Sequence, residues 1–283
     1  MALPLVSILI PMYNASSFIE ETLNCAQNQT YKNIEIIVSD DCSSDDSIAI
    51  VQKFAADDSR IRLLMNAQNQ GMCKNWNILF SEAKGEYLLK LDADDVIYLN
   101  FVETLLIKAM AHSADIVSAA YEVRLEFEYR TIPIHKVLNE GFVKNLVNTI
   151  IFNNPFHLVF SLLNAEFVKN ISLDKPYFLE TEVGDAEFLI RSALNGVKLY
   201  FYPEVLGYYR MHTSNSSRSP LKQTRSFYFD VLPIYHVILK KISNFNYKQK
   251  IRNDLIDYLK NIVKLNAPFD LKLLKQMIVL LIT

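Results

Sequence analysis

The sequence predicts an α/β protein with a mostly parallel central sheet flanked by helices and a helical C-terminal extension. The first observation is a set of short apolar segments with the length and composition of strands, at residues 5–10, 34–39, 60–65 and 87–91. Helical patterns separate them, and this alternation indicates βαβ units with right-handed crossovers. The second observation is that two of these strands end in clusters of aspartates. An open α/β sheet binds ligands beyond the carboxyl ends of its strands, so we expect the acids at one crevice.

Helix signals follow the first strand and recur along the chain. Ser17 followed by Glu20 matches a capping box, so Ser16 or Ser17 is expected to cap a helix that runs to about Gln29. Further helices are expected at residues 47–56, 72–83, 101–112 and 139–152, and further strands at residues 116–129 and 198–202, the last ending in a turn at Pro203-Glu204.

Composition is that of a globular protein. The chain has 283 residues and a formal net charge of −2, which argues against a general nucleic-acid binder. Its three cysteines are odd in number and lack metal-ligand spacing, so a reduced, cytoplasmic protein is the simplest interpretation. No secretory signal is visible, and no apolar stretch approaches the ~18–20 residues that span a bilayer.

The C-terminal part differs in charge from the rest. We expect one domain over residues 1–215, with halves at 1–100 and 101–215, and a helical extension over residues 216–283. From residue 219 onward the chain has 11 Lys or Arg against 4 Asp or Glu. Two interpretations stay open for these basic amphipathic helices. They pack on the parent domain, which we favour, or they contact an anionic membrane peripherally from the cytoplasmic side.

The most informative stretch is Asp92-Ala93-Asp94-Asp95, which ends the fourth strand. Carboxylates held this close repel one another unless a cation lies among them, and such oxygen-rich sites suit Mg²⁺ or Mn²⁺ together with substrate phosphates. The alternative is a polar turn that caps the next helix, since Asp favours turns and caps.

Two other strand ends are expected beside this acidic stretch. The second strand ends in Asp40-Asp41, and the first ends in Pro11-Met12-Tyr13-Asn14. An aromatic side chain at the first end can stack on a base, and a carboxylate at the second can accept a hydrogen bond from a base imide N–H. The three strand ends together predict a nucleotide site.

These motifs resemble family 2 glycosyltransferases with the GT-A fold. The similarity is close over residues 5–100 and resumes at two later segments. The motifs that carry the similarity are Val6-Ser7-Ile8-Leu9-Ile10-Pro11-Met12-Tyr13-Asn14, Gln29-Thr30-Tyr31, Ile34 to Ser43, Gly85 to Asp95, Gly184 to Arg191 and Tyr209-Arg210-Met211-His212.

The resemblance assigns roles in donor binding. Pro11 and Tyr13, with Asn14 beside them, would line the base pocket, and Asp41 would read the base edge with support from Asp40. In the acidic stretch the resemblance places Asp92 and Ala93 near the ribose, makes Asp94 the principal ligand of Mn²⁺ or Mg²⁺, with Asp92 beside it, and gives Asp95 a supporting or capping role.

The resemblance also implies cations near the diphosphate. Lys74 is the candidate from the third helix, where Trp76 stands at the position of the usual arginine and Asn77 is retained. His212 would reach the metal or the diphosphate, with Arg210 in support.

Asp185 is the predicted general base. It begins a helical pattern, and the alternative is a plain helix N-cap. The family's usual Glu-Asp pair is here Gly184-Asp185, so the pattern departs at one position, while the arginine six residues later is retained as Arg191. Glu187 is the alternative base.

The resemblance implies inverting transfer of a sugar from a nucleotide-diphosphate donor, expected to be a UDP-sugar, to an acceptor hydroxyl on a glycan or lipid-linked glycan. Residues 153–161 are expected to face the acceptor, although for His157 the interpretation as a partly buried histidine with its hydrogen bonds satisfied is favoured. Two alternatives stay open. One is a sugar-phosphate nucleotidyltransferase, in which a Gly-rich basic loop is expected after the first strand, and the other is a non-catalytic glycan-binding protein. An oxidoreductase is disfavoured because G-x-G-x-x-G is absent there.

Overall fold

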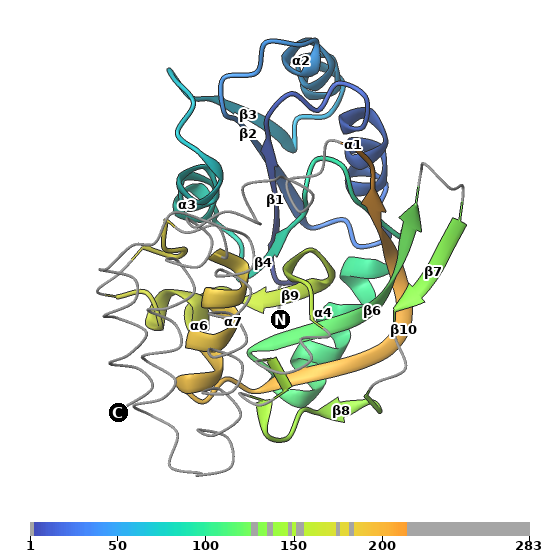
Figure 1. Cartoon of the computed structure of the whole chain (residues 1–283), viewed down its shortest axis with the longest axis vertical. Coiled ribbons are helices and arrows are strands. Elements are labelled where there is room, and N and C mark those ends of the chain that lie inside the picture. Colours follow the sequence, from blue (N-terminus) through green and yellow to red (C-terminus); the bar gives the residue numbers. More distant parts are fainter. Residues whose placement is uncertain are drawn as a thin grey trace, which may run out of the picture.

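The computed structural model of the protein describes residues 3–125, 130–134, 138–146, 149–150, 156–173, 176–180 and 184–213. These residues form one large sheet with helices on both of its faces (Figure 1). The α/β class predicted from the sequence is therefore confirmed. The predicted extension at residues 216–283 lies outside the described residues.

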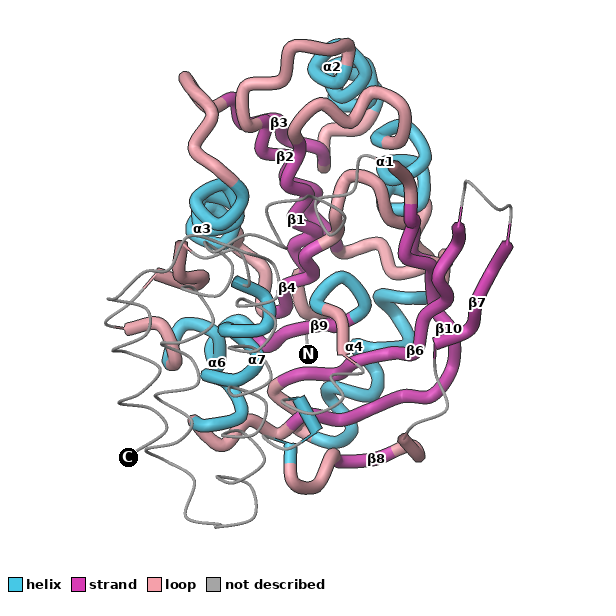
Figure 2. Tube along the Cα trace, in the orientation of Figure 1, coloured by secondary structure: helices cyan, strands magenta, loops and turns pink. Residues whose placement is uncertain are grey.

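The first half of the chain alternates strands and helices as predicted. Its elements are β1 (Val6–Met12), α1 (Ile19–Gln27), β2 (Ile34–Asp40), α2 (Ser47–Asp57), β3 (Ile61–Met65), α3 (Met72–Glu82) and β4 (Tyr87–Lys90). All four strands are parallel, and Ile8 of β1 lies between Ile36 of β2 and Leu89 of β4. The carboxyl ends of β1, β2 and β4 therefore lie at the same edge of the sheet (Figure 2).

The second half adds mostly antiparallel pairs. Its elements are β5 (Val96–Ile97), α4 (Phe101–His112), β6 (Ile116–Leu125), β7 (Arg130–Ile134), β8 (Gly141–Phe142), the 3-10 helix η1 (Leu158–Phe160), β9 (Ser161–Asn164), α6 (Ala165–Asn170), α7 (Gly184–Leu194) and β10 (Leu199–Met211). Only β6 and β10 are parallel here. The sheet is thus mixed, and the expectation of a mostly parallel sheet holds for the first half.

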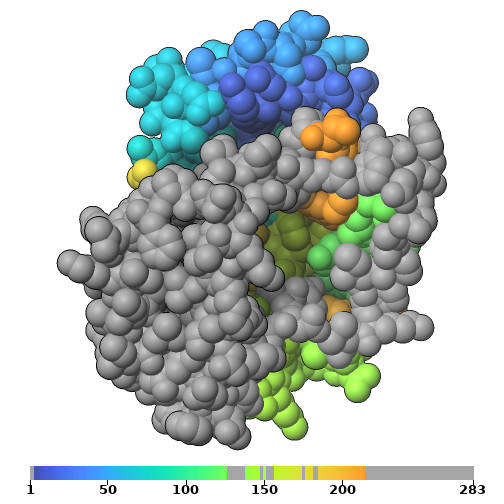
Figure 3. Space-filling model, in the orientation of Figure 1, coloured from blue at the N-terminus to red at the C-terminus, as the bar shows by residue number. Residues whose placement is uncertain are grey.

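The strand order places the first four parallel strands on one side of the sheet and the strands of the second half on the other. It runs β3-β2-β1-β4-β9-β6-β10-β5, with β7 on β6 and β8 on β10. Strand β9 joins the halves, because it pairs with β4 on one side and β6 on the other. In the space-filling view, the orange end of β10 lies against the blue N-terminal half above a hollow in the surface (Figure 3).

Two hydrophobic cores cover the two faces of the sheet. Along β1, Ile8 and Ile10 pack in one core with Leu23 of α1, whereas Leu9 belongs to the other core with Trp76 of α3 and Phe188 of α7. Successive strand residues point to opposite faces, so the near-continuous apolar run of β1 fits a strand that is buried on both sides.

The predicted capping box at Ser17 is wrong. Helix α1 begins at Ile19, its N-cap is Phe18, and no side chain caps it. The preceding turn is tied to the loop before α2, because the backbone N–H of Ser16 donates to Asp45 Oδ2 and that of Ala15 donates to Ser47 Oγ. These longer-range bonds replace the local cap.

Two predictions in the second half are also wrong. Strand β10 does not turn at Pro203-Glu204 but continues to Met211, with register shifts against β6 between Tyr202 and Tyr208. Such irregularities let a proline stay within a strand, since it cannot donate to the ladder. The first part of the helix predicted over 139–152 is instead strand β8 (Gly141–Phe142), which pairs with β10, whereas residues 146, 149 and 150 are helical as predicted. In the described ranges no helix is both long and apolar enough to cross a bilayer.

Candidate functional site

A cavity of about 630 Å³ opens where β1, β2, β4 and β10 end. Its volume lies in the usual range for small-molecule and cofactor sites. Of the residues predicted from the sequence, those lining it are Pro11, Tyr13, Asn14, Asp41, Asp92, Ala93, Asp94 and His212. Trp76, which stands at the position of the usual arginine, also lines it, and further lining residues without a predicted role include Phe18, Asn75 and Tyr209. The parallel strands therefore bring together most of the predicted nucleotide site.

The acidic loop is held from behind by neighbouring elements. The hydroxyl group of Thr22 in α1 lies 2.9 Å from the carbonyl oxygen of Ala93 and 3.0 Å from that of Asp95. From β10, the Nε of Arg210 donates to the carbonyl oxygen of Asp94 at 2.8 Å, and its backbone N–H donates to Asp95 Oδ1 at 2.9 Å. Arg210 thus holds the acidic loop, whereas the sequence placed it in support of His212, and it is itself paired with Glu21 at 2.5 Å.

Asp94 and His212 form the pair at the centre of the site. His212 Nε2 lies 3.0 Å from Asp94 Oδ2, and the imidazole stacks on Phe18 with ring centroids 4.3 Å apart. Burial and the nearby Asp92 raise the pKa of Asp94, although the bond to His212 opposes this. The loop therefore concentrates negative charge that a cation would relieve.

Asp95 lies beneath this pair. It is fully buried, and its pKa is raised well above the usual value by burial and then by Asp94 and Asp92. Its Oδ2 has no hydrogen-bond partner within the described part of the chain. A buried carboxylate oxygen without a donor is costly, and a cation bound nearby would offset that cost.

The donor set fits a divalent metal that arrives with a substrate. Within the described ranges, no three His, Cys, Asp or Glu side chains gather to form a metal site by themselves. Mg²⁺ and Mn²⁺ in phosphate-transfer and related sites use one or two protein ligands, and phosphates and waters complete the shell. Asp94 and His212 provide that number of ligands.

The end of β2 has a structural as well as a lining role. Asp41 is buried and accepts hydrogen bonds from the backbone N–H groups of Gln70 and Gly71 and from the amide of Asn66. Asp40 is also buried, and its Oδ2 accepts from the backbone of Cys42 and Ser43. Asp41 thus fixes the loop before α3, and Asp40 supports its own loop as predicted.

Asn14 and Asp45 connect the loops after β1 and β2. Asn14 has a positive φ of 47°, and its Oδ1 accepts from the backbone N–H of Ser44 at 2.8 Å. Asp45 accepts from the Ser47 hydroxyl at 2.5 Å and from the backbone N–H of Ser16 at 3.0 Å. Burial would raise the pKa of Asp45, but these hydrogen bonds lower it to about 2.

Replacing Asp45 by Asn is expected to lower the free energy of unfolding by about 1–2 kcal/mol at pH 7. The folded pKa of Asp45 lies below its usual 3.8, so its contribution is present above that pH and lost as pH falls towards 2. Urea unfolding of the wild type and Asp45→Asn at pH 7 and at about pH 2.5 measures the difference in unfolding free energy, which should narrow in acid. Asp46→Asn, at an exposed residue without a capping bond, is the control. A gap of equal size at both pH values would contradict this assignment.

Lys90 is the charged residue that the sequence analysis missed. It is the last residue of β4, is 2% exposed, and pairs with Asp92 Oδ1 at 2.5 Å. Its ammonium lies 4.1 Å from the ring centroid of Trp76, which lines the cavity. A lysine within an otherwise apolar strand was the available signal.

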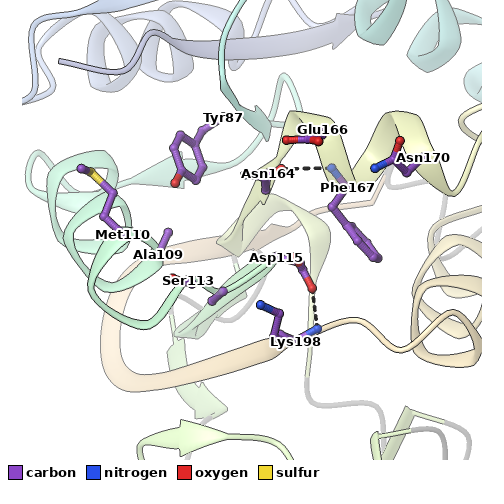
Figure 4. A pocket seen from close by; sticks show the side chains of 11 residues that line it. Tyr87, Ala109, Met110, Ser113, Asp115, Asn164, Glu166, Phe167, Asn170 and Lys198 are labelled. Atoms are coloured by element: carbon purple, nitrogen blue, oxygen red, sulfur yellow. Dashed lines mark hydrogen bonds between the residues drawn. The ribbon is translucent and has the colours of Figure 1, made fainter. Parts of the chain in front are cut away.

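A second cavity, of about 450 Å³, lies between α4, α6 and the start of β10 (Figure 4). Its charged lining residues are Asp115, Glu166 and Lys198, and Asp115 already accepts from the backbone N–H of Lys198 at 2.8 Å. None of the predicted site residues lines it. The candidate site is therefore the first cavity.

Comparison with known proteins decides the family. A family model described as "Glycosyl transferase family 2" matches residues 7–162, which is more than half of the chain. The chain belongs to this family. It is therefore a glycosyltransferase, as the motifs at the ends of β1, β2 and β4 predicted.

Relatives of this glycosyltransferase agree with that assignment. It is 30% identical over 232 residues to WfaP of Escherichia coli, named UDP-Glc:alpha-D-GlcNAc-diphosphoundecaprenol beta-1,3-glucosyltransferase, covering 77% of this chain and 82% of WfaP. For three other bacterial relatives, the match spans only 35% to 39% of the relative's own length.

Solved structures show the GT-A fold. Staphylococcus aureus TarS 1–349 in complex with UDP-GlcNAc has a TM-score of 0.71 at 22% identity, over 97% of this chain and 79% of that one. A mannosyltransferase, PcManGT from Pyrobaculum calidifontis in complex with GDP-Man and Mn²⁺, has a TM-score of 0.65 at 14% identity, over 98% and 79% of the two chains.

In this glycosyltransferase Asp185 lies in the first turn of α7. It does not line the cavity, and its Oδ1 accepts from the backbone N–H of Ala186. The preceding Gly184 packs on α3, where a Cβ would lie 2.6 Å from Cys73 Sγ and 3.5 Å from Trp76. A side chain at this position would therefore require Cys73 to move.

Three other predicted residues lie away from the cavity. Lys74 is exposed and lies 3.3 Å from Glu180. Glu187 and Arg191 are buried and form a two-point ion pair with distances of 2.9 and 3.1 Å, and Arg191 also donates to the backbone of the loop that precedes α7. We infer that this pair fixes the start of α7, so Glu187 is a poor candidate for the base.

Proposed function

We propose that this glycosyltransferase transfers a sugar from a UDP-sugar to an acceptor hydroxyl, with inversion at the anomeric carbon. The observation that carries the proposal is that Tyr13, Asp41, Asp92, Asp94 and His212 line the same cavity. It combines an exposed aromatic side chain, hydrogen-bond acceptors and a carboxylate–imidazole pair of the kind that can hold a metal. Nucleotide, ribose and diphosphate are bound by groups of these three kinds.

The nucleotide is expected at the end of β1 and β2. Tyr13 is 55% exposed and can stack on the base, while Pro11 supplies an apolar wall. Asp41 already accepts three hydrogen bonds, and its two oxygens have capacity for one more from the base. The UDP-GlcNAc bound by TarS supports uracil as the base.

The diphosphate is expected over Asp94 and His212. These residues would hold Mn²⁺ or Mg²⁺, which supplies Lewis-acid neutralisation of the charge on the leaving diphosphate. Asp92 remains available for the ribose, and Arg210 keeps the loop in place through the carbonyl of Asp94. The Mn²⁺ bound by PcManGT supports this assignment.

Asp185 is proposed as the general base. It would remove the proton of the acceptor hydroxyl as that oxygen attacks the anomeric carbon, while the bond from this carbon to the diphosphate oxygen breaks. UDP leaves, and the proton stays on Asp185. Because attack and departure occur on opposite faces, the configuration inverts in one displacement without an enzyme nucleophile.

The acceptor is proposed to be a lipid-linked glycan, presented at the cytoplasmic face of a membrane. WfaP, whose name gives a diphosphoundecaprenol acceptor, supports this class. Residues 156–161, which run through η1 to the start of β9, are the described part of the segment expected to face the acceptor. His157 there is part of an aromatic cluster with Tyr121 and with Tyr209, which lines the cavity.

Isothermal titration of the full chain with UDP tests the donor site. Binding is expected in Mn²⁺ and is expected to weaken by on the order of tenfold or more when the metal is chelated with EDTA. GDP and ADP are the controls for the base. Equal binding of all three nucleotides, or binding of UDP that is indifferent to Mn²⁺, would contradict the proposal.

A further inference from the structure

The donor cavity has a buried cation beneath its floor. Lys90 ends β4 with its side chain on the face of the sheet that α3 covers, and only 2% of it is exposed. Burying a charge is costly unless it is paired, and an apolar residue would fit this strand at less cost. A function for the charge is therefore expected.

The partners of Lys90 are both residues of the cavity wall. Its ammonium lies 2.5 Å from Asp92 Oδ1 and 4.1 Å from the ring centroid of Trp76. In the described part of the chain, Asp92 Oδ1 is the one acceptor of this ammonium. The other oxygen of Asp92, Oδ2, has no protein partner in the same ranges, and the Asp92 side chain is 28% exposed.

We propose that Lys90 is a positioning residue that holds Asp92 Oδ2 ready to accept a hydrogen bond from the ribose hydroxyls of the donor. Without Lys90, Asp92 would rotate freely and would compete with Asp94 for the metal. The ion pair also separates the roles of the two aspartates, since Asp94 is paired with His212 instead. Trp76 fixes the ammonium from the other side, because a cation over an indole face is held by the ring quadrupole.

This inference rests on the proposed donor site. A nucleotide without ribose hydroxyls tests the role of Lys90 separately from the binding of the donor. The Lys90→Met variant keeps the length of the side chain and removes the charge. At saturating Mn²⁺ it is expected to bind UDP ~10-fold more weakly than the wild type, the order found when partners behind a binding residue are removed. Its affinity for 2′,3′-dideoxy-UDP is expected to stay within about twofold, because that ligand has no hydroxyl for Asp92 to accept.

Two further variants complete the experiment. Lys84→Met, at an exposed lysine three residues before β4, is the matched control and should bind both nucleotides as the wild type does. If Lys90→Met does not fold, Lys90→Gln makes the same comparison with an uncharged side chain that can still hydrogen-bond.

The outcomes distinguish the two claims. Unchanged UDP affinity in Lys90→Met overturns the role of Lys90 and leaves the donor site intact. An equal loss for UDP and dideoxy-UDP also overturns it, because that pattern indicates a general structural effect. A wild-type protein that does not bind UDP in Mn²⁺ overturns the proposed donor, and this role with it.

Discussion

Asp185→Asn is expected to lower kcat by ~10²–10⁴-fold, the usual contribution of a positioned general base. The amide keeps the size of the side chain and can still accept from the backbone N–H of Ala186, so α7 should begin as before. It cannot take the proton of the acceptor hydroxyl. Because Asp185 does not line the donor cavity, the affinity for UDP in Mn²⁺ should stay within about twofold.

The measurement is the rate of UDP release from the nucleotide sugar that the wild type turns over, with acceptor present. Glu166→Gln is the matched control, since Glu166 is an exposed acid in the first turn of another helix. Wild-type turnover by Asp185→Asn would refute the base assignment. A loss of turnover with an equal loss of UDP affinity would instead indicate that the start of α7 shapes the donor site.

The same reasoning distinguishes Glu187 from Asp185 as a candidate for the general base. Its carboxylate is buried and is held by Arg191 at 2.9 and 3.1 Å, whereas a base must reach the acceptor hydroxyl. Removing one partner of a buried ion pair leaves the other charge uncompensated. Glu187→Gln therefore affects the stability of the fold first, which a thermal melt would reveal.

The nucleotide half of the site was predictable because it depends on local pattern and sheet topology. Apolar runs locate β1, β2 and β4, and parallel pairing brings their carboxyl ends to one edge whatever the details of the side chains. Tyr13, Asp41 and Asp94 follow from that rule alone, since each lies just beyond a strand. All three line one cavity.

The remaining features depend on contacts between distant residues. In the sequence, Lys90 is an unexplained charged residue in an apolar strand. The structure explains it by its contacts with Trp76 and Asp92. Ser17 reads as a cap until Asp45 takes the backbone N–H of Ser16. In each case the structure depends on a contact between separate parts of the fold. The periodicity of the sequence does not reveal such contacts.

The second half of the chain shows another reason why prediction from the sequence fails. Pro203-Glu204 carries a strong turn signal, yet β10 passes through it because β6 pairs with the strand on both sides of the irregularity. Tertiary pairing thus overrides a local preference. The continuation of β10 is what brings Arg210 and His212 to the acidic loop, so the error in the strand boundary bore directly on the site.

Asp94→Ala is expected to lower the affinity for UDP in Mn²⁺ on the order of 100-fold, since a bound metal contributes several kcal/mol and each factor of ten is about 1.4 kcal/mol. UDP binding in EDTA should change little, because Asp94 acts through the metal. Titration of both proteins with UDP, with and without Mn²⁺, gives the four affinities. Asp57→Ala, at an exposed acid at the end of α2, is the control.

Stability gives an independent check on the same variant. Burial and Asp92 raise the pKa of Asp94, which means that its charged form is disfavoured in the folded protein without metal. Replacing it by alanine removes this repulsion, so the metal-free variant should melt no lower than the wild type. Mn²⁺ with UDP should raise the melting temperature of the wild type and leave that of Asp94→Ala nearly unchanged. A variant that still responds to Mn²⁺ would show that the metal is held elsewhere, and Asp94 would lose its proposed role.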